Sequence, residues 1–159
     1  RSGATKAGDA AIPIRGLMPG MAVHLADCCS PLPGDRIVGI VATGIGVTVH
    51  TIDCDTLVSF GDTPERWLDL SWDKVDSDSP MHVGRLSLIV ANETGSLAEL
   101  ATAIAKCKGN ITNFKITSRS ADFFELLVDV EVEDARHLTD IMATLRALPC
   151  VSNVDRARG

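Results

Sequence analysis

The sequence predicts an α+β protein built from two parts, a small cysteine-containing α+β module and a ferredoxin-like βαββαβ domain. Two observations support this division. The polar, acidic segment "DKVDSDSP" separates two apolar halves, and the second half alternates strand-like and helix-like patterns in the order βαββαβ. The expected bounds are a linker at 1–15, the cysteine module at 16–75, a second linker at 76–81 and the βαββαβ domain at 82–159.

The βαββαβ domain opens with a strand from His82 to Ala91, in which apolar and polar residues alternate with the period of a half-buried strand. A helix follows in "SLAELATAIAKC", where Ser96 and Glu99 have the spacing of a capping box and Gly109 marks the end. The apolar stripe of this helix is expected at Leu97, Leu100, Ala101 and Ile104.

A hairpin and a second helix complete the domain. "NITNFKITS" and "FFELLVDVEV" read as strands joined by the turn "RSAD". The second of these strands has five inward-facing apolar residues, Phe124, Leu126, Val128, Val130 and Val132. "DARHLTDIMATLRALP" has helical spacing after an acidic cap, and "CVSNVDRA" supplies the last strand.

Composition narrows the class of protein. The 159 residues are 45% hydrophobic, which is enough for compact cores, and no apolar run is long enough to span a membrane. The N-terminal residues lack the apolar core of a signal peptide, so we expect a cytoplasmic protein with no membrane partner. The net charge of −6 argues against free nucleic acid binding over the whole surface.

Five cysteines in a reducing compartment are more often metal ligands, reactive thiols or small hydrophobes than disulfides. Cys28, Cys29, His50 and Cys54 have the ligand count of a structural zinc site, although adjacent cysteines are unusual ligands. The alternative is that the thiols pack as small hydrophobes. We expect no cysteine catalysis, because no pattern for an oxyanion hole accompanies these residues.

The cysteine module resembles a specific family. "ADCCSPLPGDRIVGIVATGIGVTVHTIDC" is similar to the cysteine-containing module near the C-terminus of the long RelA/SpoT (Rel) proteins, the (p)ppGpp synthetase/hydrolases of the bacterial stringent response. The following βαββαβ unit, with "ANETGSLAEL" and "GNITNF", resembles the ACT domain that ends the same family. The order of the two modules also agrees.

The resemblance implies a regulatory fragment that is not itself an enzyme, whose parent would be a GTP diphosphokinase and (p)ppGpp 3'-pyrophosphohydrolase. In that family the cysteine module is described both as zinc-finger-like and as a metal-free ribosome-contacting domain, so the resemblance leaves the metal open. It also implies contact with the ribosome and tRNA in the full-length protein, and a homodimer through the ACT domains with the ligand between them.

An amino-acid ligand is expected at the first strand–helix junction of the ACT-like half. Gly95 allows close backbone approach, and the N–H groups of Ser96 and Leu97 at a helix start suit a carboxylate. Asn92 and Asn113 would hold the polar head, and Ile111 an aliphatic side chain, so valine or isoleucine is the expected effector. The full candidate set is Asn92, Glu93, Thr94, Gly95, Ser96, Leu97, Asn110, Ile111, Thr112 and Asn113.

Three alternatives remain at this point. Gly95 and Ser96 could simply make a turn and a helix cap, without a ligand. The chain could belong to an ACT-regulated amino-acid biosynthetic enzyme, which would leave the cysteine block unexplained. An independent zinc-dependent RNA-binding module is disfavoured by the acidic charge. We expect the ligand to favour (p)ppGpp hydrolysis in the parent.

Overall fold

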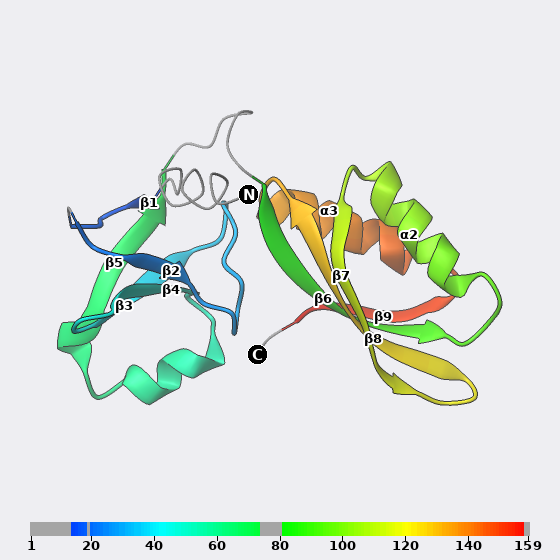
Figure 1. Ribbon diagram of the computed structural model, residues 1–159, viewed down its shortest axis with the longest axis horizontal. Helices are drawn as coiled ribbons and strands as arrows, with labels where there is room; N and C mark the ends of the chain where they lie inside the picture. The colour runs from blue at the N-terminus through cyan, green and yellow to red at the C-terminus, as the bar shows by residue number, and fades with distance from the viewer. Residues whose placement is uncertain (1–13, 19, 74–80, 158–159) are drawn as a thin grey trace. The chain divides into compact units, whose positions relative to one another are not determined.

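The computed structural model describes residues 14–18, 20–73 and 81–157 (Figure 1). The chain divides into two compact units, one before residue 81 and one formed by Met81–Ala157. Most of the two expected linkers, residues 1–13 and 76–80, lies outside the described residues.

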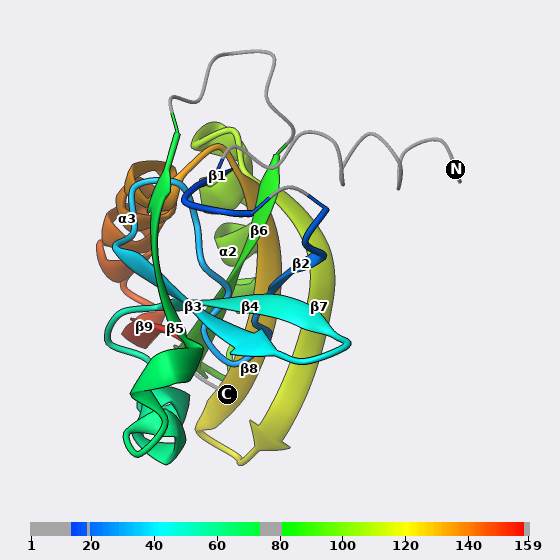
Figure 2. The same ribbon diagram turned by 90° about the vertical axis from the view of Figure 1, so that its left-hand side faces the viewer.

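The first unit is a five-stranded sheet with short 3₁₀ helices (Figure 2). Its strand order is β1-β5-β3-β4-β2, and all neighbours are antiparallel except β2, which runs parallel to β4. The elements are β1 (Ile14–Arg15), β2 (Val23–Leu25), β3 (Ile37–Ala42), β4 (Gly46–Thr51), η1 (Asp55–Phe60), η2 (Pro64–Arg66) and β5 (Trp67–Trp72). Ile14 and Arg15, expected in the N-terminal linker, instead pair with β5.

Both faces of this sheet carry buried residues, which explains why β3 is a continuous apolar run rather than an alternating one. Neighbouring residues Ile37 and Val38 of β3 belong to different clusters. The Ile37 cluster contains Val47, Val49 and Leu70. The Val38 cluster contains Ala26, Cys29, Ile40, Cys54 and Leu57. Two of the candidate metal ligands, Cys29 and Cys54, therefore lie in the Val38 cluster.

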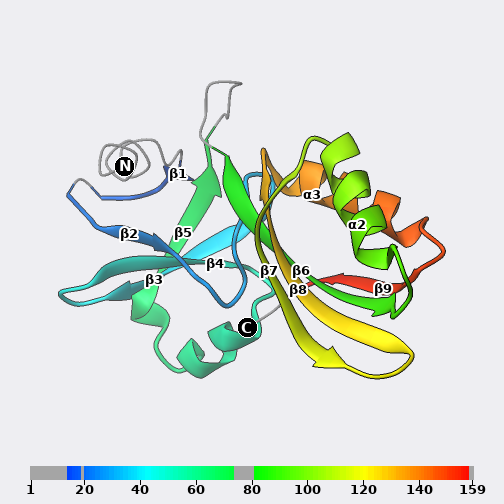
Figure 3. The same cartoon turned by 45° about the vertical axis from the view of Figure 1, so that its right-hand side comes forward.

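The second unit has the predicted ferredoxin-like arrangement, with a four-stranded antiparallel sheet in the order β7-β8-β6-β9. Both helices cover the same face of the sheet (Figures 1 and 3). The elements are β6 (His82–Ala91), α2 (Ser96–Lys106), β7 (Asn110–Arg119), β8 (Phe123–Val132), α3 (Ala135–Arg146) and β9 (Val151–Arg156). The predicted α+β fold is confirmed.

The core of this unit lies between the sheet and the two helices. All five β8 residues expected to face inward are buried. They pack beside alternate residues of β6, which are Gly84, Leu86, Leu88 and Val90, and beside Leu138, Ile141 and Leu145 of α3. The intervening residues of β6, from Val83 to Ala91, and of β8, from Phe123 to Glu131, lie on the opposite face of the sheet.

The start of α2 differs from the prediction. The capping box at Ser96 and Glu99 is wrong, because Gly95 is the N-cap residue and Ser96 lies inside the helix with only 2% exposure. The buried stripe also shifts, since Ala101 is exposed and Ala103 is buried. The left-handed Gly95 precedes the first helical residue, Ser96, whose N–H donates to the carbonyl of Glu93 at 3.2 Å.

The end of α2 is closed by a Schellman motif rather than by Gly109 alone. Lys108 adopts the left-handed conformation with φ of 65°. Its N–H donates to Ala105 at 2.9 Å, and the Gly109 N–H donates to Ile104 at 3.0 Å. Gly109 is required for packing, because a Cβ there would lie 2.8 Å from a side-chain carbon of Ile141.

Among the described residues, neither α2 nor α3 has the length and apolar character that a helix needs to cross a membrane.

Candidate functional site

The cysteine and histidine candidates converge at the end of the parallel β2–β4 pair. Leu25 pairs with Val49, so the chain leaving β2 carries Cys28 and Cys29 alongside His50 of β4. A turn then brings Cys54 back, because its N–H donates to the carbonyl of Thr51 at 3.0 Å.

The loop after the cysteine pair is held by the Pro-x-Pro-Gly-Asp segment. A carboxylate oxygen of Asp35 accepts a hydrogen bond from the Leu32 N–H at 2.7 Å, and Gly34 takes the left-handed conformation with φ of 99°. Pro31, Leu32 and Pro33 are buried. This turn fixes the loop that carries the two adjacent thiols.

The four ligand atoms form one compact group, and all of them lie within 4.8 Å of one another. Cys28 Sγ lies 3.4 Å from His50 Nδ1 and 3.4 Å from Cys54 Sγ. Cys29 Sγ lies 3.9 Å from the same histidine nitrogen. Three of the four residues are buried, and Cys28 is partly exposed.

This geometry fits a tetrahedral zinc ion. With Zn–S bonds of about 2.3 Å, the sulfur atoms of a tetrahedral site lie about 3.8 Å apart, close to the separations between the donors here. Three thiols and one imidazole are also a zinc ligand set. We name the group Cys28, Cys29, His50 and Cys54 the cysteine centre.

Burial and backbone hydrogen bonds set the protonation of the cysteine centre. Burial lowers the pKa of His50, which keeps the imidazole neutral as a metal ligand requires. Burial raises the pKa of Cys29 to about 12, although the Thr51 N–H donates to its sulfur at 3.3 Å. The pKa of Cys54 is lowered, because burial is outweighed by hydrogen bonds from the Thr56 N–H and from the neighbouring thiols.

The sequence did not reveal the roles of Thr51 and Thr56. Both donate a backbone N–H group, which every residue except proline carries, and a side-chain hydrogen bond from each threonine adds to it.

The candidate amino-acid site begins at Gly95, which has a φ of 85° and no atom within 4 Å of a Cβ built on it. The N–H of Ser96 is not free for a carboxylate, since it donates to Glu93 at 3.2 Å. The first turn of α2 still leaves the N–H groups of Leu97 and Ala98 without partners inside the helix, because helical bonding starts with Glu99 donating to Gly95.

Asn92 already donates hydrogen bonds to other residues of the domain. Its side-chain amide donates to the carbonyl of Ser120 at 2.8 Å, and its backbone N–H donates to Asp122 at 2.9 Å. These bonds tie the loop before α2 to the turn between β7 and β8.

The second group of candidate residues lies at the other end of the sheet. Ala91 pairs with Phe123 at the start of β8, whereas Ile111 pairs with Val130 near its end. Seven residues of β8 separate these positions, or about 23 Å at about 3.3 Å per residue. Figure 3 shows the start of β7 and the start of α2 at opposite ends of the sheet. One protomer therefore does not bring residues 92–97 and 110–113 together.

Comparison with known protein families assigns both units. Residues 12–73 match the RelA/SpoT RIS domain, and residues 80–156 match an ACT domain. The chain therefore combines the RIS domain of RelA/SpoT proteins with an ACT domain. We refer to the two units below as the RIS domain and the ACT domain.

Relatives carry both domains in the same chain. GTP pyrophosphokinase rsh of Brucella ovis is 40% identical over 154 residues, covering 97% of this chain and 20% of that protein. The bifunctional (p)ppGpp synthase/hydrolase SpoT of Escherichia coli K12 is 29% identical over 147 residues, covering 92% of this chain and 20% of SpoT. The chain thus spans about a fifth of the length of these RelA/SpoT relatives.

Among solved structures, the ACT domain from GTP pyrophosphokinase of Chlorobium tepidum is similar to the second unit. It is 20% identical, covers 48% of this chain and 97% of that domain, and gives a TM-score of 0.42.

Proposed function

We propose that the chain is the regulatory region of a (p)ppGpp synthetase/hydrolase of the stringent response, and that its ACT domain binds a branched-chain amino acid, valine or isoleucine. The names of the relatives, a GTP pyrophosphokinase and a (p)ppGpp synthase/hydrolase, support the parent activity. The observation that carries the ligand site is the open, left-handed Gly95 directly before α2. In this proposal the chain supplies no catalytic residue.

The ligand carboxylate would lie over the N–H groups of Leu97 and Ala98, where the positive end of the helix dipole faces it. An approach to this point is open because Gly95 has no side chain. The aliphatic side chain would contact Ile111, which is partly buried. A charged ligand side chain would lose hydration against that apolar wall.

A homodimer would complete this site. β7 is an edge strand, and its residues Phe114 and Ile116 pair with buried β8 residues on the helix-covered face, yet they are 38% and 43% exposed. Pairing two β7 edges antiparallel would cover both side chains. It would also place the start of one β7 beside the end of the β7 of the other copy. That end is followed by Ser120, whose carbonyl accepts a hydrogen bond from Asn92 in the loop before α2.

The dimer therefore accounts for the separation of the two candidate segments within one protomer. Residues 92–97 of one copy would meet residues 110–113 of its partner, with the amino acid held between them.

The RIS domain, in this proposal, contacts the ribosome and tRNA in the full-length cytoplasmic protein, and the ACT domain reports amino-acid sufficiency to distant catalytic domains. Ligand binding can favour hydrolysis only if it stabilises one of two global states. We propose that the ligand-bound state is the hydrolytic one.

The cysteine centre is proposed to hold zinc. Its donor set, its short separations and the neutral His50 support this assignment. Zinc would link β2, β4 and the start of η1 and so stabilise the RIS domain.

Calorimetric titration of the chain with valine and isoleucine tests the sensing role. Free amino acids are abundant in cells, so dissociation constants in the micromolar to millimolar range are expected, or about −8 to −4 kcal/mol. D-valine and lysine serve as ligands that should bind poorly. No heat and no shift in melting temperature at about tens of millimolar valine would refute the sensing role, since mass action should stabilise any binder.

Two glycine variants give a matched pair for this titration. Gly95→Val should abolish binding, while Gly44→Val, at a turn of the RIS domain, should leave it unchanged. Both glycines have a positive φ, 85° and 81°, and both have open space around a Cβ. The backbone strain is therefore similar, and only the first change blocks the proposed site.

Regulation of an amino-acid biosynthetic enzyme by this ACT domain is the alternative. It gives no reason for the RIS domain at residues 12–73.

A further inference from the structure

Within the cysteine centre, two sulfur atoms are placed for a bond to each other. Cys28 Sγ and Cys54 Sγ lie 3.4 Å apart, and they come from segments 26 residues apart in the sequence. A disulfide needs a separation of about 2.05 Å, so the two atoms must approach by about 1.4 Å. Small side-chain rotations can supply this movement.

The third thiol, Cys29, also lies within 4.8 Å of Cys54 Sγ and interacts with it, but its sulfur has other partners as well. Cys29 Sγ accepts a hydrogen bond from the Thr51 N–H at 3.3 Å and faces His50 Nδ1 at 3.9 Å. A Cys28–Cys29 bond is also sterically unfavourable, because adjacent Cα atoms lie about 3.8 Å apart across a trans peptide, less than disulfides usually require. The structure has no cis peptide bond in its described residues.

Exposure distinguishes the two sulfurs that can pair. Cys28 is partly exposed, whereas Cys54 is 6% exposed. A small oxidant in solution therefore reaches Cys28 first, and Cys54 lies behind it at contact distance as the resolving thiol.

We propose that Cys28 and Cys54 form a reversible disulfide when the protein meets a peroxide. Cys28 attacks one peroxide oxygen, which gives a sulfenic acid and releases one water molecule. The Cys54 sulfur then displaces the hydroxyl of the sulfenic acid, which forms the S–S bond and releases a second water. A dithiol reductant restores both thiols and is itself oxidised to a disulfide.

This modification would compete with the proposed zinc site, because an S–S bond removes two of the four ligands. Only this consequence depends on the zinc assignment. The disulfide itself depends on the contact between the two sulfurs, which is present without metal.

The test is peroxide treatment of the full chain after removal of metal with a chelator, followed by trypsin digestion without reductant. Cleavage after Arg15, Arg36 and Arg66 gives peptides 16–36 and 37–66, the first with Cys28 and Cys29 and the second with Cys54. We expect these two peptides to be linked within one chain, with the loss of two hydrogens. Fragmentation of the linked pair should assign the bond to Cys28.

Serine variants separate the roles of the thiols. Cys29→Ser should still form the link, Cys28→Ser should abolish it, and Cys150→Ser, at a buried cysteine of the ACT domain, should change nothing. In Cys54→Ser the sulfenic acid has no resolving thiol, so a dione reagent should trap it on Cys28. A bond assigned to Cys29, a link only between chains, or no link in the unaltered chain would overturn the proposal.

A second arm uses zinc-loaded protein and a colorimetric zinc chelator. Zinc release should rise in step with the disulfide. If the chain binds no zinc, the metal assignment fails while the metal-free arm still decides on the disulfide.

Discussion

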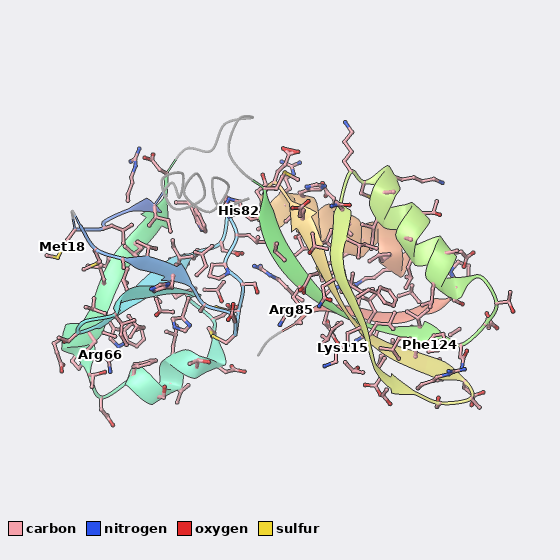
Figure 4. All side chains as sticks on the ribbon, viewed as in Figure 1. Met18, Arg66, His82, Arg85, Lys115 and Phe124 are labelled. Carbon is pink, nitrogen blue, oxygen red and sulfur yellow. The ribbon has the colours of Figure 1, made fainter. Side chains whose placement is uncertain are left out.

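Arg85 and Asp129 face each other directly across β6 and β8 and form a two-pronged ion pair. Arg85 Nε lies 2.7 Å from Asp129 Oδ1, and Nη2 lies 3.2 Å from Oδ2. Figure 4 shows Arg85 on the side of β6 away from the two helices. The pair therefore joins the two central strands of the ACT sheet on the face opposite the two helices, and the Asp129 side chain is only 13% exposed.

We predict that Arg85→Met lowers the free energy of unfolding of the ACT domain by about 1 kcal/mol, since Asp129 keeps its charge without this partner. Arg85→Lys should recover part of the loss, because lysine restores the charge but not the second hydrogen bond. The helical circular dichroism signal during urea unfolding measures this, because both α-helices of the described residues belong to the ACT domain. An unchanged midpoint for Arg85→Met would contradict the prediction.

His137 should be a stabilising link between the two helices. Its Nδ1 accepts the Glu133 N–H at 3.0 Å, and its Nε2 lies 2.7 Å from the carbonyl oxygen of Cys107 just after α2. Replacing His137 with alanine should cost about 1 to 2 kcal/mol, because both backbone groups lose a partner. His24→Ala, at an exposed histidine of the RIS domain, is the control and should leave the midpoint of the helical unfolding transition unchanged.

The ACT domain should lose stability on acidification through His82. Burial lowers the pKa of this histidine below 6.5, so the unfolded chain takes up a proton that the folded domain does not. Its contribution is complete above about pH 6.5 and is lost as the pH falls toward the folded pKa, with a slope of up to about 1.4 kcal/mol per pH unit. His82→Gln should flatten this part of the pH profile. The same slope in wild type and variant would show that another group is responsible.

Zinc content should depend on the cysteine centre alone. Elemental analysis of protein purified without chelator is expected to give one zinc per chain, and Cys29→Ser should remove most of it. Cys150→Ser is the matched control, since this cysteine is equally buried but lies in the ACT domain. Tryptophan fluorescence reports the effect on stability, because both tryptophans, Trp67 and Trp72, are in the RIS domain. Zinc retained by Cys29→Ser would contradict the assignment.

Dimerisation should depend on the β7 edge. Ile116→Lys places a charge where two edges would meet, so light scattering should show a monomer where the unaltered chain is a dimer. Val58→Lys, at a residue of η1 that is 83% exposed, should leave the dimer intact. A monomeric unaltered chain, with or without valine, would refute the dimer.

The sequence predicted the ACT fold well because its central strands are buried on one face only. The alternation in β6 and β8 reveals both their bounds and their inward residues. Capping at α2 was not predictable from residue type, since Ser96 is a good cap by preference yet is buried inside the helix. Whether Ser96 caps α2 or lies inside it depends on how the helix packs, which local sequence patterns do not encode.

The candidate sites also divide into features that residue type predicts and features that depend on the three-dimensional arrangement. The grouping of the cysteine centre was predictable, because thiols and an imidazole have distinctive chemistry, and the structure brings their four donor atoms within 4.8 Å of one another. The separation of residues 92–97 from 110–113 was not, because it depends on the register of β7 against β8. Backbone donors such as the Thr51 N–H leave no trace in the sequence at all.

The parallel pairing of β2 with β4 has a consequence for folding kinetics. The β3–β4 hairpin joins neighbouring segments, but β2 must reach β4 across the intervening chain, and such non-local pairing forms slowly. Cys28 and Cys29 therefore meet His50 only after this late step. We expect zinc to bind a chain that has already folded, and so to slow unfolding while leaving the refolding rate nearly unchanged. Loss of metal would then shorten the lifetime of the folded RIS domain.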